Sequence, residues 1–219
     1  MIELAVLDIA GTTVEEHQAV YRALEEAVTA AGGHPTAADI QHWMGAGKRE
    51  AIAAMLGHDD IDAAFLDFRR RLGAASRDTP PVPLPGVPDA IAKLRSTGVK
   101  VALTTGFDRE VTGNLLRAIG WDDGVVDAVV CVDDVLAGRP APYMIFRAME
   151  ATGVSDVATV LTAGDTIRDL QAGTNAGAGI VVGVLTGGLD ERTLATAPHT
   201  HILRSVADLP ALLARSDCR

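Results

Sequence analysis

Short apolar runs alternate along most of the chain with segments of helical periodicity. The runs are rich in Val, Ile, Leu and Ala, and each is followed by a polar residue or glycine; they cover residues 2–7, 99–104, 128–132, 157–163 and 179–185. Helical patterns lie between them, over residues 88–97, 108–119, 142–152 and 166–177. Strands that alternate with helices are typical of a doubly wound parallel sheet, so we expect an α/β, Rossmannoid core.

The interval 14–85 has no comparable strand pattern. Apolar positions recur there at helical spacing in segments that begin near residues 20, 36, 48 and 61. The proline-rich stretch 78–88 cannot continue a helix and predicts a stiff linker. We therefore expect two domains: an α/β core of residues 1–13 and 86–219, and an inserted all-helical cap of residues 14–85.

Composition and charge exclude several classes of partner. The 219 residues carry a formal net charge of −10, which repels nucleic acid and anionic membranes, so a small molecule is the expected ligand. Cys131 and Cys218 form no disulfide framework. The N-terminal MIELAVLDIAG has no basic start, and no apolar run is long enough to span a bilayer. We expect a cytoplasmic protein, with a homodimer through the cap helices as one option.

Polar side chains follow four of the predicted strands. Active sites of open α/β sheets lie beyond the carboxyl ends of the strands, and the residues found there are Asp8-Ile9-Ala10-Gly11-Thr12-Thr13, then Thr104-Thr105-Gly106, then Asp133-Asp134 with Arg139, and then Gly164-Asp165-Thr166 with Asp169. Asp133 and Asp134 would either orient Arg139 or cap a turn. A lone aspartate at a strand end is usually a cap, but four such ends in order indicate a reaction centre.

The residue types suit phosphoryl transfer. A carboxylate attacks phosphorus only if the phosphoryl charge is neutralised and the attack is in line. Asp8 would attack, Thr105 and nearby backbone N–H groups would hold the phosphoryl oxygens, and Arg139 would supply a fixed positive charge. Mg²⁺ prefers hard oxygen ligands and would bridge Asp8 and Asp165, with Asp169 supporting the metal or its waters.

This ordered set of motifs resembles that of the haloacid dehalogenase superfamily, and the resemblance covers the whole chain. It implies a Mg²⁺-dependent capped hydrolase of a small phosphorus-containing substrate. It also implies that the backbone carbonyl of Ala10 is a metal ligand and that Gly11, Thr12 and Gly106 contact the substrate.

Three segments resemble one subfamily, the phosphonoacetaldehyde hydrolases or phosphonatases. Most phosphatases of the superfamily have an aspartate acid/base at the position of Ala10, whereas phosphonatases have alanine. Gly138-Arg139-Pro140 is similar to the phosphonatase motif, and so is Met44-Gly45-Ala46-Gly47-Lys48, which implies that Lys48 forms a Schiff base with an aldehyde substrate. Gly45 and Arg49 beside it are expected to contact the substrate. The competing reading of Lys48 is a solvated lysine at a helix start, or a cation that only binds the substrate's anionic group.

The chain also departs from the phosphonatase pattern. Ala51 stands where the family has histidine, Gln18 where it has cysteine, and Phe107 where it has tyrosine. These departures favour the main alternative, a Mg²⁺-dependent phosphatase of a small metabolite. A haloacid dehalogenase needs no metal, so Asp165 and Asp169 argue against it. A phospho-acceptor domain of the receiver type needs no helical insert, and a catalytically inactive binding domain is the last alternative.

Overall fold

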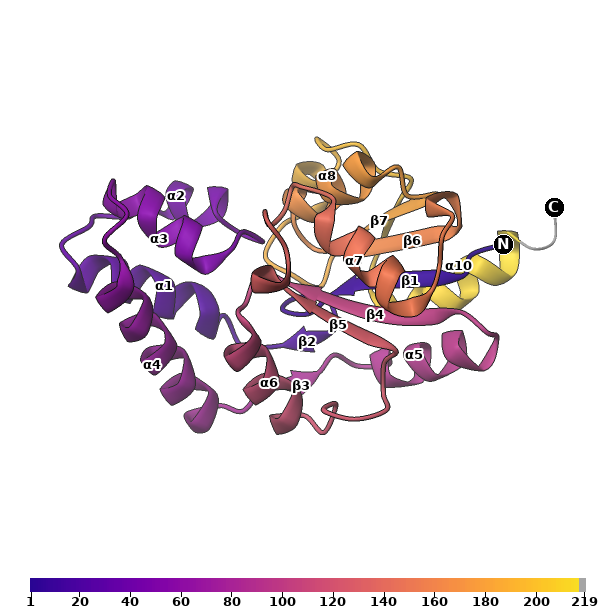
Figure 1. The fold of residues 1–219 in the computed structure, drawn as a ribbon, viewed down its shortest axis with the longest axis horizontal. Helices are drawn as coiled ribbons and strands as arrows, with labels where there is room; N and C mark the ends of the chain where they lie inside the picture. Colours follow the sequence, from indigo (N-terminus) through magenta and orange to yellow (C-terminus); the bar gives the residue numbers. More distant parts are fainter. Residues whose placement is uncertain (217–219) are drawn as a thin grey trace.

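The five apolar runs form five strands of one parallel sheet, and a short sixth strand that the runs did not include lies at its edge (Figure 1). The computed structural model describes residues 1–216, and within them the sheet has six strands in the order β5-β4-β1-β6-β7-β8. Their bounds are β1 Leu4–Asp8, β4 Lys100–Thr105, β5 Ala128–Cys131, β6 Val160–Gly164, β7 Ile180–Val184 and β8 His201–Leu203. The predicted α/β fold is confirmed. The strand expected over residues 157–163 begins only at Val160, because Asp156 caps a 3-10 turn, η2 (Val157–Thr159), before it.

Helices cover both faces of the sheet. They are α5 Val87–Ser96, α6 Arg109–Ala118, α7 Tyr143–Thr152, α8 Ile167–Ala176, α9 Glu191–Leu194 and α10 Leu209–Ser216, with 3-10 turns η1 Val132–Asp134 and η3 Val206–Asp208. The pattern of apolar positions predicted α5 to α8 to within two residues at each end, but not the short α9 or α10.

Alternate side chains of β1 enter the two halves of the core. Ala5 and Leu7 pack with Ile91 of α5, whereas Leu4 and Val6 pack with Met144 of α7. All five residues of β1 are buried, because helices cover the strand on both sides. The carboxyl end of β1 is therefore enclosed between neighbouring strands β4 and β6.

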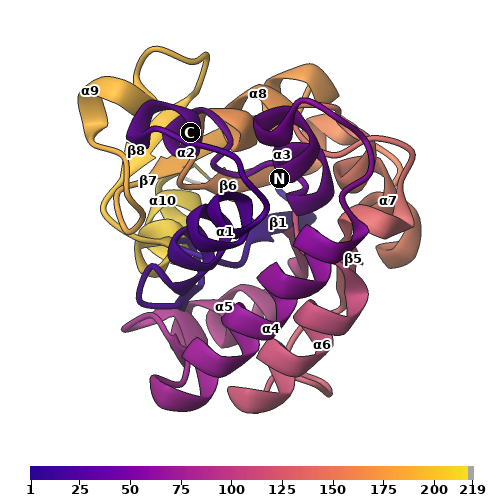
Figure 2. The same cartoon turned by 90° about the vertical axis from the view of Figure 1, so that its left-hand side faces the viewer.

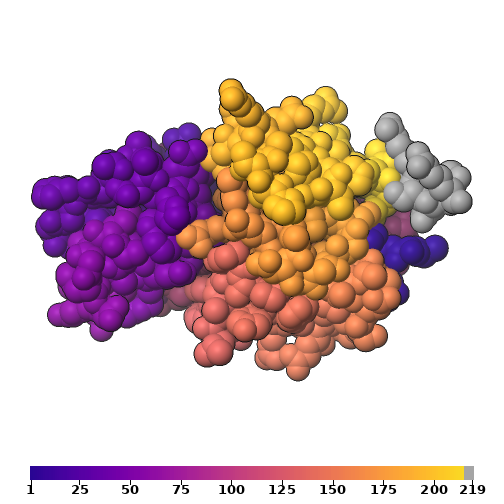
Figure 3. Space-filling view, turned by 90° about the horizontal axis from the view of Figure 1, so that it is seen from above, coloured from indigo at the N-terminus to yellow at the C-terminus, as the bar shows by residue number. Residues whose placement is uncertain are grey.

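The insertion after β1 forms a separate group of four helices (Figures 1 and 2). Their bounds are α1 Ala19–Ala30, α2 Ala37–His42, α3 Lys48–Leu56 and α4 Asp62–Asp78. They share an apolar core that includes the fully buried Leu24, Ile52 and Phe68. A capping box opens α2, with the Thr36 hydroxyl accepting from the backbone N–H of Asp39. In Figure 3 the insertion lies directly against one end of the sheet domain.

Two short strands that the sequence pattern did not predict lie at the base of the insertion. β2 (Val14–Glu15) and β3 (Val82–Pro83) pair antiparallel, and the Leu84 N–H donates to the Thr13 carbonyl at 3.0 Å. Each strand has two residues, too few to show alternation, and the pairing joins segments far apart in the chain. The division into a cap of residues 14–85 and a core remains a prediction. The two boundaries of that predicted cap lie next to the paired strands β2 and β3.

None of the described helices is long and apolar enough to cross a membrane. Cys131 is a free, buried thiol at the end of β5. The expectation for Cys218 lies outside the described residues.

Candidate active site

Three parallel strands bring the candidate side chains to one edge of the sheet. β1 lies between β4 and β6, with Asp8 opposite Thr104 and Leu7 opposite Ala163. Asp8 therefore ends β1 beside the end of β4, while Asp165 directly follows β6. These strand ends are in register, so residues more than 150 positions apart in the chain meet.

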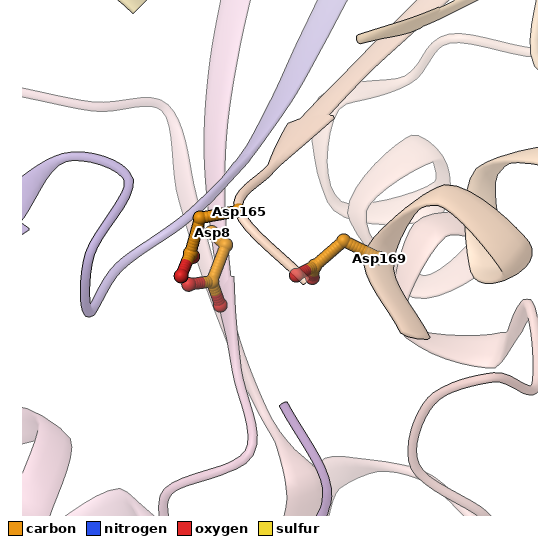
Figure 4. Close-up of side chains that lie close together, drawn as sticks. All are labelled: Asp8, Asp165 and Asp169. Carbon is orange, nitrogen blue, oxygen red and sulfur yellow. The ribbon is translucent and has the colours of Figure 1, made fainter. Parts of the chain in front are cut away.

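The carboxylates of Asp8, Asp165 and Asp169 form a buried cluster, with one oxygen of each within 4.8 Å of the others. Figure 4 shows Asp8 and Asp165 side by side at their strand ends, with Asp169 pointing toward them from α8. Burial raises the pKa of Asp8 to about 6 in spite of the neighbouring Arg139. Burial and the charges of Asp8 and Asp169 raise the pKa of Asp165 well above its usual range.

This cluster fits a divalent cation. Carboxylate oxygens are the ligands that Mg²⁺ prefers, and three buried carboxylates repel one another unless positive charge lies among them. Arg139 offsets only part of that charge. The site is therefore suited to Mg²⁺ at Asp8, Asp165 and Asp169; the expected role of the Ala10 carbonyl remains a prediction.

Hydroxyl groups orient two of the three carboxylates. The Thr12 hydroxyl donates to Asp165 Oδ1 at 2.8 Å, so Thr12 supports a carboxylate in this structure. Asp169 lies in the first turn of α8, where its Oδ2 accepts from the Thr166 N–H at 3.0 Å and from the Thr166 hydroxyl. Asp169 is thus both the third residue of a helix capping box and a member of the cluster.

Arg139 joins the cluster to β4. Its side chain is 4% exposed, and its Nη1 lies 2.6 Å from Asp8 Oδ1 while its Nε lies 2.9 Å from Asp169 Oδ1. Its Nη2 donates to the Thr104 hydroxyl at 2.7 Å. The two carboxylates raise the pKa of Arg139 although burial opposes this, so the guanidinium remains a fixed positive charge.

Asp133 and Asp134 do not orient Arg139. Asp133 accepts from the Arg109 N–H at 3.1 Å, and Asp134 pairs with the Arg109 side chain and accepts from the Cys131 N–H at 2.8 Å. Asp134 caps the turn η1, the other role expected, whereas Asp133 accepts from the first residue of α6.

Lys48, the first residue of α3, is buried between the insertion and the sheet domain. Its side chain is 6% exposed, its Nζ donates to the Ala46 carbonyl at 2.9 Å, and Nζ lies 5.7 Å from the ring centre of Phe107. Burial lowers the pKa of Lys48 to about 8, although the charge of Asp8 acts in the opposite direction. Lys48 is therefore not a solvated surface lysine.

Arg49, the next residue of α3, differs from Lys48 in its contacts and exposure. It pairs with Asp62, lies over the Phe65 ring at 4.8 Å from the ring centre, and its side chain is 54% exposed. Its charge is already paired within the insertion, so its contacts do not support the predicted substrate contact.

The predicted glycines lie at points of close approach. A Cβ on Gly106 would lie 2.5 Å from the Ala46 carbonyl oxygen, so this glycine lets the loop before α3 contact the sheet domain. A Cβ on Gly45, which is in that loop, would lie 2.5 Å from the Thr166 hydroxyl oxygen. Gly11 has φ +78°, and a Cβ there would lie 2.7 Å from Asp165 Oδ2. All three allow backbone to approach the site.

Two cavities adjoin these groups. One of about 930 Å³, between insertion and sheet domain, is lined by residues that include Lys48, Arg49 and Arg139. A second of about 390 Å³ is lined by residues that include Ala10, Gly11 and Asp165. Thr105 ends β4 and is buried, with its hydroxyl accepting from the Phe107 N–H at 3.1 Å.

The sequence motifs gave no role to Thr104 or Tyr21, which lie beside the site. The Thr104 hydroxyl, not that of its neighbour Thr105, accepts a hydrogen bond from Arg139. Successive residues of a strand point to opposite faces of the sheet, so this alternation could have assigned different roles to the two threonines. Tyr21 borders the second cavity, but no motif includes it, and its only signal is its spacing of three and seven residues from Leu24 and Val28.

Comparison with known proteins agrees with this geometry. The model of the haloacid dehalogenase-like hydrolase family matches residues 2–177. The chain is similar to phosphonoacetaldehyde hydrolases of Parabacteroides distasonis (33% identity over 184 residues, 73% of this chain and 69% of that protein) and of Bacteroides fragilis (28% over 253 residues, 97% and 95%).

Two solved structures are also similar to this chain. The chain resembles a phosphonoacetaldehyde hydrolase-like protein from Oleispira antarctica with a TM-score of 0.81 and 26% identity, over 100% of this chain and 93% of that one. A hydrolase from Pseudomonas syringae shares the fold, with a TM-score of 0.82 and 22% identity over 98% and 99% of the two chains. With its family match over most of its length, the chain belongs to the haloacid dehalogenase-like hydrolases.

Proposed function

We propose that this protein cleaves the carbon–phosphorus bond of phosphonoacetaldehyde or a close analogue, with Asp8 as nucleophile and Lys48 as the amine that activates the organic half. The observation that carries this proposal is the buried amine of Lys48, which interacts electrostatically with Asp8, because a buried lysine with a lowered pKa is suited to Schiff-base formation. Ala10 in place of a proton-transferring aspartate agrees with a carbon leaving group.

In the proposed reaction, Lys48 and the substrate aldehyde form an iminium. The iminium withdraws electrons from the C–P bond, which breaks as the phosphoryl group passes to an oxygen of Asp8. Water then cleaves the aspartyl-phosphate and releases phosphate, while hydrolysis of the remaining enamine frees Lys48 and acetaldehyde. No acid is required at position 10, since the electron pair of the broken bond is accepted by the iminium.

The surrounding residues would prepare Asp8 for this attack. Arg139, at 2.6 Å from Asp8 Oδ1, orients the nucleophile and supplies positive charge beside the incoming phosphoryl group. Thr105 and the backbone N–H groups after β1 and β4 would hold phosphoryl oxygens. Mg²⁺, held by Asp8, Asp165 and Asp169, would neutralise phosphoryl charge. Gly106 and Gly45 allow the loop before α3 to contact the sheet domain, which would limit the access of water to the site.

A phosphatase acting on a small phosphate ester is the second candidate. It is favoured by Ala51, which is fully buried in the apolar core of the insertion and provides no proton shuttle near Lys48. In that case Lys48 would bind an anionic group of the substrate instead of forming an imine.

The test is borohydride trapping with phosphonoacetaldehyde and Mg²⁺, read by intact mass, together with phosphate release in untrapped reactions. Wild type should give an adduct that K48R lacks, and D8N should release no phosphate while it still forms the adduct. An enzyme that gives neither adduct nor phosphate would refute the phosphonatase proposal. Phosphate release from esters, blocked by D8N, would then support the phosphatase.

A further inference from the structure

Tyr21 extends from α1 of the insertion toward the candidate site. Its ring centre lies 5.9 Å from Lys48 Nζ, and its side chain lines the cavity of about 390 Å³ that Ala10 and Asp165 also line. Tyr21 therefore lies near the Lys48 amine and borders a cavity that is also lined by Asp165 of the carboxylate cluster.

The Tyr21 hydroxyl is available as a donor. It forms no hydrogen bond with any group in residues 1–216 of the structure, whereas Thr186, another hydroxyl residue on the same cavity wall, donates to the Gly11 carbonyl at 2.6 Å. Burial, followed by the charges of Asp165 and Asp8, raises the pKa of Tyr21 well above its usual range, so the phenol keeps its proton.

Few side chains near Lys48 are free to donate a proton or hydrogen bond to a bound aldehyde. Glu16 also lines the cavity, but its Oε2 accepts from the Val20 N–H at 2.9 Å. Ala10 has only a methyl group on the cavity wall, and Ala51, one turn after Lys48, is fully buried in the apolar core of the insertion. Because the Tyr21 ring centre lies 5.9 Å from Lys48 Nζ, an aldehyde carbon bonded to that nitrogen would lie close to the Tyr21 side chain.

We propose that the Tyr21 hydroxyl donates a hydrogen bond to the aldehyde oxygen of the substrate and thereby polarises the carbonyl that Lys48 attacks. This inference rests on the proposed function. The nitrogen–carbon bond forms as the C–O π bond breaks, and the oxygen leaves as water with two protons from the lysine ammonium. Protonated lysine and aldehyde thus yield iminium and water, and Tyr21 ends the step with its own proton.

The experiment compares Y21F with wild type and with Y143F. Y21F keeps the ring that packs in the insertion and removes only the oxygen; Tyr143, the only other tyrosine, is half-exposed at the start of α7. The readouts are the rate of the borohydride-trapped adduct at Lys48, kcat and KM for phosphonoacetaldehyde, and Tm.

We expect Y21F to slow adduct formation and to lower kcat by roughly 100-fold, with KM and Tm close to wild type, since one donor to a reacting oxygen is removed. Y143F should match wild type in every readout. Y21F with a wild-type trapping rate would overturn the role of Tyr21 and leave the phosphonatase proposal standing. A loss of activity that follows a fall in Tm would also overturn it. If wild type forms no adduct, the proposed function and this inference both fail.

Discussion

Arg139 Nη1 lies 2.6 Å from Asp8 Oδ1, and both side chains are almost completely buried. The same guanidinium reaches Asp169 and the Thr104 hydroxyl through its other nitrogens. One planar side chain thus sets the position of the proposed nucleophile relative to a proposed metal ligand and to the neighbouring strand. A lysine has a single nitrogen, which cannot occupy the three separate positions of the guanidinium nitrogens.

R139K should therefore lower kcat by roughly 100-fold, because Asp8 loses a charged donor that orients it. The matched control is R109K, which alters an exposed arginine paired with Asp134. Steady-state phosphate release from the preferred substrate measures the effect. Equal kcat values for R139K and wild type would contradict a role for Arg139 in catalysis.

Mg²⁺ should stabilise the folded protein through Asp165. Binding to the native state alone raises Tm as the metal concentration rises. We expect MgCl₂ to raise the Tm of wild type but not that of D165N, and EDTA to abolish wild-type phosphate release. D156N, at the exposed cap of η2, should respond to Mg²⁺ like wild type. A D165N protein with an unchanged Mg²⁺ response would exclude this carboxylate as a ligand.

The pH dependence of imine trapping should report the lowered pKa of Lys48. A pKa of about 8 leaves roughly one amine in ten neutral at pH 7, far more than an ordinary lysine has. The trapping rate should rise from pH 6 and level off above about pH 8. A rate that still rises steeply between pH 9 and 10 would show that the amine titrates like a surface lysine.

The lowered pKa of Lys48 also makes the stability of the protein depend on pH. Between pH 8 and 10.5 the unfolded chain binds the Lys48 proton and the native protein does not, so stability from this group rises with pH across that window. Wild type should therefore gain free energy of unfolding relative to K48M as the pH increases from 8 to 10. Urea denaturation at several pH values measures this difference, and a constant difference would contradict the shift.

G106A should displace the loop before α3 from the sheet domain. The added Cβ would lie 2.5 Å from the Ala46 carbonyl oxygen, in a loop that also positions Lys48. We expect lower kcat and slower trapping, with phosphate release from a small ester less affected. G113A is the control, since a Cβ in the middle of α6 meets nothing within 4 Å. G113A should be neutral or slightly stabilising. Equal trapping rates in G106A and wild type would contradict the inferred closeness of loop and core.

Local sequence determined five of the six strands of the parallel sheet, most of the helices and the identity of the strand-end carboxylates. Apolar runs and helical spacing are local signals, so α5 to α8 were predicted closely, and Asp8 and Asp165 were recognised as strand-end residues. The parallel arrangement then requires these ends to meet at one edge. This is why the acidic cluster could be predicted without coordinates.

Only the tertiary structure decided how distant segments use their side chains. Lys48 and Arg49 are adjacent in sequence, yet one is buried near Phe107 and the other pairs with Asp62 at the surface. Successive residues of a helix point about 100° apart, and the packing of the insertion on the sheet selects which one faces inward. The β2–β3 pair and the Arg139–Thr104 bond depend on the same long-range packing, which no local pattern contains.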